Sequence, residues 1–299
     1  MKFLIIIPCH NEEENIFHCL KSLEQQNFQD FDIVIVNDGS TDNTPKIIEN
    51  FVQQSPIKAR IKTIHLRTSQ HQPGAKVVRT FQKGLESVNW EDYEVICKYD
   101  ADIIFPQSYL KQIDKLFSAN HQLGMASGIV KISKNNNLFP LDNSILLFDD
   151  EEDWEFENLS SKNHIRGPIK AYRKDCLLAM KGLRPVLGWD NIDVALCEMY
   201  GFTTETNKDL WVKHLRPTAF KYKKQKAEKL GEYFYNLGLN FPLAFIASAK
   251  SAWKNRSFSE LLITMKVFLQ QKHPLALSKE EIQHIRKSRW KKMLGKIGL

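Results

Sequence analysis

The sequence predicts a layered α/β domain built around a mainly parallel sheet. Short apolar runs alternate with stretches of helical spacing through the first half of the chain, as in domains whose strands are joined by crossover helices. The first run, Phe3–Pro8, is continuously apolar, which is typical of a strand buried on both faces. The 299 residues are enough for one or two domains, and 42% hydrophobic and 26% charged residues indicate an ordinary globular protein.

The individual elements follow from their periodicity and end signals. Predicted strands are short apolar runs, and they cover Phe3–Pro8, Ile33–Val36, Arg60–Leu66, Tyr93–Tyr99, Met125–Ile132, Ile165–Arg173 and Leu210–Arg216. Predicted helices carry apolar residues three and four positions apart, and one of them begins with Pro106, a residue that suits a first helical turn. These helices cover 12–26, 42–54, 75–88, 106–119 and 175–180.

The alternation is interrupted once and ends near residue 214. The segment 133–163 contains an asparagine run and a dense acidic cluster, so it is interpreted as an excursion or a mobile loop. After His214 the chain is rich in lysine and helical in pattern. We therefore predict a catalytic domain over 1–220, with a nucleotide-binding half (1–102) and an acceptor half (103–220), followed by a basic helical extension over 221–299.

Several features predict a cytoplasmic protein. The five cysteines are odd in number and scattered, without a CxxC pair, which argues against a disulfide framework or a zinc site. The opening residues make a poor signal peptide, because their apolar run stops at Pro8 and turns acidic. The most apolar later stretch, Phe241–Ala249, is too short to cross a bilayer.

The net charge of +7 is concentrated at the C-terminus. Six lysines and arginines and no acid lie between Gln283 and Leu299. One interpretation is a solvated helical face. The other is a peripheral contact with an anionic membrane surface, to which exposed apolar residues would add; nucleic acid is not the predicted partner. These apolar residues are Trp253, Phe258, Leu261, Leu262 and Phe268.

Polar clusters directly follow three of the predicted strands. They begin at Cys9, Asn37 and Asp100, and ligands of open α/β sheets bind in the crevice at the carboxyl ends of strands. Each cluster alone could simply form a turn. Three such clusters at successive strand ends favour one shared binding crevice.

The Asp100-Ala101-Asp102 segment has the sharpest chemistry. Two carboxylates at a strand end are hard oxygen ligands that suit Mn²⁺ or Mg²⁺, which would bridge to a diphosphate. No Walker A or GxGxxG sequence follows a strand, so P-loop and dinucleotide-binding functions lose their main support. The diphosphate would instead be held by metal and by cations, for which Lys76 and Arg79 are candidates; both could also be ordinary helix-surface charges.

Together these motifs resemble the successive signatures of family 2 inverting glycosyltransferases, which have the GT-A fold. The resemblance covers roughly the first 215 residues. The processive members carry a QxxRW motif, whereas Arg289-Trp290 follows Gln283 at a different spacing, so a non-processive enzyme is expected. The motifs that carry the resemblance are Pro8-Cys9-His10-Asn11-Glu12-Glu13-Glu14-Asn15-Ile16, Val36-Asn37-Asp38-Gly39-Ser40-Thr41-Asp42 and Asp100-Ala101-Asp102.

The resemblance implies roles for the residues at these strand ends. Asp38 would accept a hydrogen bond from a base N–H, Asp100 would approach the ribose or diphosphate, and Asp102 would bind the metal. His10 stands where the family usually has a tyrosine. The residues implied to line the nucleoside pocket are Pro8, His10, Glu12 and Asp38.

The second half of the chain also resembles the family. Gly188-Trp189-Asp190-Asn191-Ile192-Asp193 is similar to its Glu-Asp-x-x-Asp-like motif, with Trp189 in place of the usual Glu. Asp190 would be the base that takes the acceptor hydroxyl's proton, and Asp193 would orient acceptor or base, although either aspartate could be a helix cap. His214, late in the chain, resembles the histidine that completes metal coordination in many GT-A enzymes.

These observations predict inverting, metal-dependent transfer of a sugar from a nucleotide-diphosphate sugar to an acceptor hydroxyl. A UDP-sugar is favoured over a GDP- or TDP-sugar, and the acceptor would be a glycan or a lipid-linked molecule in cell-surface glycan assembly. Two alternatives stay open: a non-catalytic nucleotide-sugar-binding protein of the same fold, and a sugar-1-phosphate nucleotidyltransferase. The second is disfavoured because the loop after the first strand contains no glycine.

Overall fold

The computed structural model describes residues 1–67, 74–135, 138–159, 161–216 and 226–294. The chain forms two compact units, which are described separately. The first comprises residues 1–71, 79–182 and 200–217, and the second comprises 72–78, 183–199 and 218–299. The division of the sequence at residue 220 stays a prediction.

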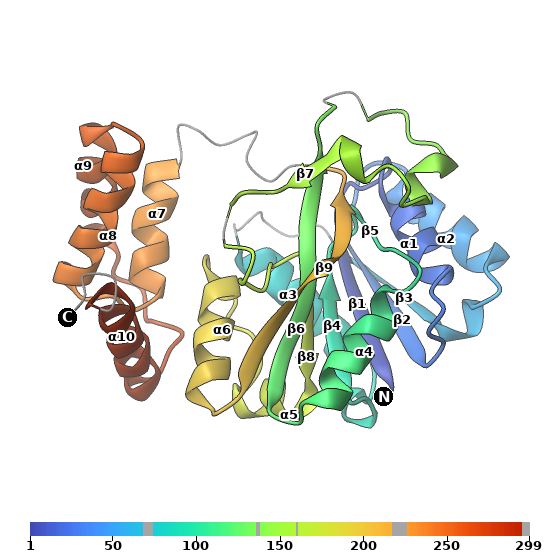
Figure 1. Cartoon of the computed structure of the whole chain (residues 1–299), viewed down its shortest axis with the longest axis horizontal. Helices are drawn as coiled ribbons and strands as arrows, with labels where there is room; N and C mark the ends of the chain where they lie inside the picture. The colour runs from blue at the N-terminus through green and yellow to red at the C-terminus, as the bar shows by residue number, and fades with distance from the viewer. Residues whose placement is uncertain (68–73, 136–137, 160, 217–225, 295–299) are drawn as a thin grey trace. The chain divides into compact units, whose positions relative to one another are not determined.

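A mixed, mainly parallel sheet of nine strands forms the centre of the first unit within the described residues (Figure 1). The strand order is β3-β2-β1-β4-β8-β6-β9-β5, with β7 paired to β6. β8 is antiparallel to both of its neighbours, whereas β6 and β9 are parallel to each other. The strands are β1 (Phe3–Cys9), β2 (Phe31–Asp38), β3 (Ile61–Leu66), β4 (Val95–Tyr99), β5 (Ile103–Ile104), β6 (Leu123–Ser133), β7 (Trp154–Phe156), β8 (Ile169–Arg173) and β9 (Thr203–His214).

The apolar runs of the sequence become the buried strands at the centre of this sheet. Every residue from Phe3 to Ile7 is fully buried, because β1 lies between β2 and β4 and helices cover the sheet. The predicted α/β fold class is thereby confirmed. The helices of this unit are α1 (Ile16–Glu24), α2 (Thr44–Gln54), α4 (Tyr109–Ala119) and α5 (Lys174–Ala179), and α3 (Ala75–Glu86) has residues in both units.

The ends of some elements differ from the prediction, and local contacts explain the difference. α1 begins at Ile16 rather than Glu12, because the Glu12 backbone N–H donates to Thr44 Oγ1 at 2.7 Å and holds this loop against the start of α2. α4 begins at Tyr109 rather than Pro106. The backbone N–H of Tyr109 donates to the backbone oxygen of Pro106, so a turn precedes the helix. β5 was not predicted, because its apolar run is only two residues long.

The segment 133–163 was expected to be an excursion or a mobile loop, and its described part is packed. It contains two short 3₁₀ helices and β7, which pairs antiparallel with the end of β6. Ile145 and Trp154 are buried in a small apolar cluster with Ile104 and Leu215. The acidic cluster therefore lies beside an ordered apolar layer of the first unit.

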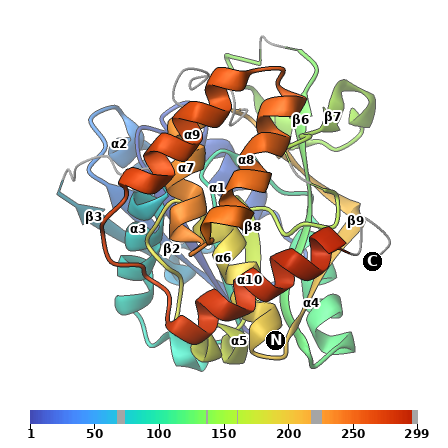
Figure 2. The same ribbon diagram turned by 90° about the vertical axis from the view of Figure 1, so that its left-hand side faces the viewer.

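The second unit is helical in its described residues (Figure 2). Helix α9 packs on both α7 and α8, and α10 contacts α6 and α8. Within the described residues, no helix is long and apolar enough to span a membrane. The helices are α6 (Trp189–Met199), α7 (Lys226–Asn236), α8 (Phe241–Lys254), α9 (Phe258–Gln270) and α10 (Lys279–Leu294).

We predict that Gly128→Ala destabilises the fold by about 1–3 kcal/mol, the usual cost of overpacking. A Cβ at this position in β6 would lie 2.3 Å from the backbone oxygen of Leu210 in β9, so the two strands would have to separate. Urea unfolding measures the change. Gly201→Ala is the control, because its Cβ would meet nothing within 4 Å and only its φ of +84° opposes the change. A Gly128→Ala protein as stable as wild type would contradict the tight β6–β9 approach.

Candidate functional site

The loops that follow β1 and β2 are hydrogen-bonded to each other. His10 Nδ1 lies 2.8 Å from the backbone oxygen of Asp38, and the Asn11 side chain accepts from the Thr41 backbone N–H at 2.8 Å. The Asn11 N–H donates in return to Ser40 Oγ at 2.9 Å. Asn11 has a φ of +55°, a conformation that Asn tolerates better than most residues. These contacts bring two of the three predicted polar clusters together.

Asp38 is buried at the carboxyl end of β2, and α3 contributes to its surroundings. Thr80 Oγ1 donates to the Asp38 carboxylate at 2.9 Å. Arg79 precedes Thr80 on the same helix and is exposed, while Lys76 lies one turn earlier and is half-buried. Each of these two cations has other interactions, so neither is a simple free surface charge.

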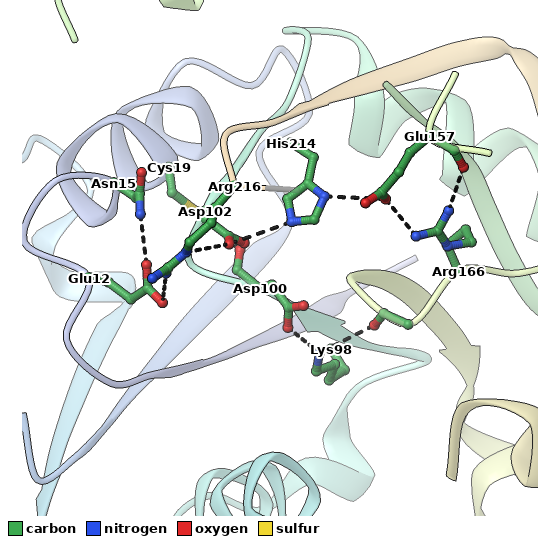
Figure 3. Close-up of polar contacts among 11 residues, drawn as sticks. Glu12, Asn15, Cys19, Lys98, Asp100, Asp102, Glu157, Arg166, His214 and Arg216 are labelled. Atoms are coloured by element: carbon green, nitrogen blue, oxygen red, sulfur yellow. Dashed lines mark hydrogen bonds and ion pairs between the residues drawn. The ribbon is translucent and has the colours of Figure 1, made fainter. Parts of the chain in front are cut away.

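Asp100 and Asp102 follow β4 and have different partners. The buried Lys98 ammonium donates to Asp100 and, at 3.3 Å, to the backbone oxygen of Gly167. The Asp102 carboxylate instead faces the His214 imidazole, with 3.5 Å between Oδ2 and Nε2 (Figure 3). Lys98 thus neutralises the first carboxylate, and the second belongs to a separate charge network.

The pairing of β5 with β9 explains how residues 102 and 214 meet. Ile103 is opposite His214 in this antiparallel pair, and the Leu215 backbone N–H donates to the Asp102 oxygen at 3.0 Å. Backbone hydrogen bonds therefore hold Asp102 and His214 close together, in addition to the contact between their side chains. The role of the two residues in metal binding stays a prediction.

His214 is held from its other side by a buried ion pair. Its Nδ1 lies 3.3 Å from Glu157 Oε2, and the same carboxylate oxygen accepts from Arg166 Nη2 at 2.6 Å (Figure 3). Burial disfavours the imidazolium, but the hydrogen bond and charge of Asp102, followed by those of Glu157, outweigh it and raise the pKa of His214 to about 10. Neither Glu157 nor Arg166 was predicted for the site: the first belongs to an acidic cluster that resembles a solvated segment, and the second lies in an expected strand without a local signal.

Arg216 links the loop after β1 to the end of β9. Its guanidinium donates to the Glu12 carboxylate and lies 3.6 Å from Asp102 Oδ2. Asn15 Nδ2 also donates to Glu12, at 2.8 Å. Burial, followed by the Asp102 charge, raises the pKa of Glu12 to about 7, although Arg216 opposes this change. Arg216 was not predicted; its only sequence signal is its place two residues after His214.

The donor atoms around Asp102 fit a divalent cation in part. A carboxylate oxygen is a ligand that both Mn²⁺ and Mg²⁺ accept from proteins, whereas a neutral imidazole nitrogen suits a transition-metal ion better than Mg²⁺. Among the described residues, no group of three or more His, Cys, Asp and Glu side chains is arranged to hold a metal ion. Asp102 could therefore supply one ligand. His214 could supply a second once the cation displaces the proton that its two carboxylate neighbours stabilise, with the remaining positions left to oxygen atoms of a diphosphate and water.

Asp190 and Asp193 lie on α6 in the second unit. Asp190 is in the first turn of the helix and Asp193 is buried one turn later, where its carboxylate accepts from the Val194 N–H at 2.7 Å. Asp193 is thus inside the helix rather than at an N-cap position. Gly188, just before α6, has a φ of +92°, and a Cβ at this position would lie 2.4 Å from the Tyr233 ring. The roles of both aspartates stay predictions.

Comparisons with known proteins agree with this architecture. The family model "Glycosyl transferase family 2" matches residues 4–178, which is more than half of the chain. The chain belongs to glycosyl transferase family 2.

One curated relative, an uncharacterized protein of Methanocaldococcus jannaschii, is 36% identical over 118 residues, which are 39% of this chain and 48% of the relative. The matched segment thus spans less than half of that relative. The poly(ribitol-phosphate) β-N-acetylglucosaminyltransferase TarS of Staphylococcus aureus is 38% identical over 76 residues, 25% of this chain and 13% of TarS.

Two solved structures share the fold. TarS residues 1–349 in complex with UDP-GlcNAc has a TM-score of 0.61 at 17% identity, covering 99% of this chain and 92% of that one. The mannosyltransferase PcManGT of Pyrobaculum calidifontis in complex with GDP-Man and Mn²⁺ has a TM-score of 0.60 at 16% identity, covering 98% and 87%. At such identity the likeness supports the GT-A fold, including the helical C-terminal region.

We predict that Glu157→Gln destabilises the protein by about 3–5 kcal/mol, because the buried Arg166 guanidinium loses its carboxylate. Urea unfolding measures the loss. Glu157→Leu combined with Arg166→Met should recover most of it, since neither charge then stays buried alone. The control Glu151→Gln removes a 65%-exposed partner of Lys131 and should cost about 0–1 kcal/mol. Equal losses for Glu157→Gln and Glu151→Gln would contradict the buried pair.

Proposed function

We propose that this chain catalyses inverting transfer of a sugar from a nucleotide-diphosphate sugar to an acceptor hydroxyl, with Mn²⁺ or Mg²⁺ as cofactor. The observation that carries the proposal is the meeting of Asp102 with His214 at the carboxyl edge of a GT-A sheet, in a chain of glycosyl transferase family 2. Open α/β sheets bind their ligands at this edge. Family membership also favours glycosyl transfer over the nucleotidyltransferase alternative.

In this proposal the strand-end loops bind the donor. Asp38 accepts from a base N–H while Thr80 fixes its carboxylate, and Pro8, His10 and Glu12 line the nucleoside pocket. Asp100 approaches the ribose or diphosphate. Lys76 and Arg79 contribute positive charge on the diphosphate side. A UDP-sugar is the first donor to test, with a GDP-sugar second, because the two solved structures of this fold were determined with UDP-GlcNAc and GDP-Man.

The leaving diphosphate needs stabilisation as the glycosidic bond breaks. A bound divalent cation supplies Lewis-acid stabilisation of that charge, and Asp102 and His214 would hold it. Arg216 places a fixed guanidinium beside Asp102 and Glu12, so it adds positive potential at the same edge. The Glu157–Arg166 pair keeps the His214 ring oriented toward Asp102.

On the acceptor side, Asp190 takes the proton of the attacking hydroxyl and Asp193 orients acceptor or base. Inversion follows from a single displacement at the anomeric carbon. The acceptor class is a glycan or lipid-linked molecule in cell-surface glycan assembly, which the name of the relative TarS, a poly(ribitol-phosphate) glycosyltransferase, supports.

A peripheral contact of the C-terminal tail with an anionic membrane surface is a second part of the proposal. Three tail cations have partners within the second unit: Arg286 donates to the Gly238 oxygen at 2.6 Å, Arg289 to the Tyr233 hydroxyl at 3.1 Å, and Lys292 to Glu198 at 3.5 Å. Lys287 and Lys291 are exposed and would make the contact; Lys296 lies outside the described residues.

A panel of nucleotide sugars tests the donor proposal directly. Thermal shift with Mn²⁺ present identifies which nucleotide sugar binds, because a ligand of the folded state raises the melting temperature. Release of the nucleotide diphosphate then distinguishes an enzyme from a non-catalytic binder. Binding of none of the UDP-, GDP- or TDP-sugars would contradict the proposal.

We expect Asp102→Ala to abolish nucleotide-sugar turnover and to weaken Mn²⁺ binding in the presence of UDP, with the fold retained. The physical reason is the loss of one of the two ligands that would hold the cation. Calorimetric Mn²⁺ titration and far-UV circular dichroism measure the two effects. Asp209→Ala is the control, since this carboxylate is exposed on β9. Full activity of Asp102→Ala, or of wild type in EDTA, would rule out the metal-dependent mechanism.

We expect Asp190→Asn to lower the transfer rate by about two to four orders of magnitude, the usual contribution of general-base catalysis. Donor affinity should be unchanged, because the substitution keeps shape and removes basicity. Single-turnover transfer and calorimetric donor binding measure the two quantities. Normal transfer by Asp190→Asn together with loss in Asp193→Asn would reassign the base to Asp193.

A further inference from the structure

The turn between α8 and α9 carries two aromatic side chains outside any core. Trp253 is the penultimate residue of α8 and is 86% exposed, and Phe258 begins α9 and is 71% exposed. We refer to residues 253–258 as the hairpin tip. The sequence grouped both aromatic residues with Phe268, but Phe268 is buried and belongs to the helical core. Exposed aromatic side chains indicate an interaction site when they belong to a larger apolar patch.

The hairpin tip is a rigid turn and not a loose loop. The Ser257 side chain caps α9 by accepting from the Glu260 N–H, and Glu260 accepts from Ser251 at 2.5 Å and Asn255 at 2.9 Å. Arg256 adopts a φ of +51°, where helix ends usually carry glycine. The backbone of the hairpin tip is therefore held by hydrogen bonds, and the side chains of Trp253 and Phe258 extend from it.

Apolar exposure continues along both helices behind the tip. Phe241 and Phe245 are spaced by four residues on α8, and Phe258 and Leu262 are spaced by four on α9, so each pair lies on one face of its helix. The two helices pack side by side (Figure 2). Their exposed large apolar residues are Phe241, Phe245, Ile246, Trp253, Phe258, Leu262, Ile263 and Leu269.

The charge of this hairpin selects its partner. Between Phe241 and Lys272 there are five lysines and arginines and one acid, Glu260. That acid is engaged within the tip, whereas Lys250 and Lys254 are exposed and form no ion pair among the described residues. Apolar residues flanked by uncompensated cations complement an anionic lipid surface. The same charges would repel a second copy of the hairpin.

From these observations we propose that the α8–α9 hairpin is the membrane-docking element of this protein, with Trp253 and Phe258 inserted among the lipids and Lys250 and Lys254 at the headgroups. The proposal deepens the membrane part of the proposed function. It moves the main contact from the tail of α10, where three cations have protein partners, to the hairpin.

Co-sedimentation of the full chain with vesicles tests the proposal. We expect binding to phosphatidylcholine vesicles containing phosphatidylglycerol, and little binding to pure phosphatidylcholine. Trp253→Ser combined with Phe258→Ser should weaken binding at least about tenfold, because the buried apolar area is lost. The control Leu159→Ser with Leu178→Ser removes two exposed leucines elsewhere (53% and 45% exposed) and should leave binding unchanged. Circular dichroism and thermal melting verify that each variant is folded.

A matched pair of charge reversals separates hairpin from tail. Lys250→Glu/Lys254→Glu and Lys287→Glu/Lys291→Glu change the net charge equally, at the same spacing of four residues, on exposed positions of α8 and α10. The hairpin variant should lose binding and the tail variant should keep most of it. The reverse pattern, no binding of wild type, or aromatic variants that bind as wild type would overturn the proposal.

Three further outcomes are decisive. If sedimentation velocity shows a dimer that Trp253→Ser/Phe258→Ser disrupts, and vesicles are not bound, the hairpin pairs with a second copy and the lipid proposal fails. Vesicle binding needs no sugar transfer. Retained binding without turnover therefore overturns only the transferase proposal, and turnover without binding overturns only the docking proposal.

Discussion

The antiparallel pairing of β5 with β9 is the constraint on which the candidate site depends. It places a two-residue strand, directly after the paired aspartates, opposite the last residues of a strand more than a hundred positions later in the sequence. Because backbone hydrogen bonds fix this register, the backbones of Asp102 and His214 are held close together, and the Glu157–Arg166 pair then orients the imidazole ring. A shift of one residue would turn His214 to the opposite face of the sheet.

Two adjacent cations at the end of β9 then dictate the environment of the segment before β8. Lys213 and His214 are both buried, and buried cations need anionic partners. Asp150 accepts from Lys213 at 2.7 Å between the Phe148 and Trp154 rings, and Glu157 partners His214. Two acids of the acidic cluster, Asp150 and Glu157, therefore compensate the buried cations of β9, while its other five acids are exposed.

Local signals in the sequence account for most of the fold and for the position of the strand-end acids of the candidate site. Continuous apolar runs predict buried strands such as Phe3–Cys9, and strand-end aspartates predict where Asp38 and Asp102 lie. Glu157 and Arg216 were not predicted, because their partners are distant in sequence: His214 lies 57 residues from Glu157, and Glu12 lies 204 residues from Arg216. An acid among seven acids, or an arginine in a lysine-rich stretch, carries no local pattern that distinguishes it from a solvated charge.

In the C-terminal helices, too, the local sequence does not show which apolar residues are buried and which are exposed. Phe258 and Phe268 lie on one helix, and apolar periodicity treats them alike, yet one is exposed and the other is packed. Phe268 packs against Tyr235 of α7, with 6.4 Å between the ring centroids, whereas the hydrogen bonds of Ser257, Asn255 and Glu260 order the hairpin tip without covering Phe258. Several exposed apolar side chains on two adjacent ordered helices form a surface that suits binding, and the cations beside it suit an anionic, lipid-like partner.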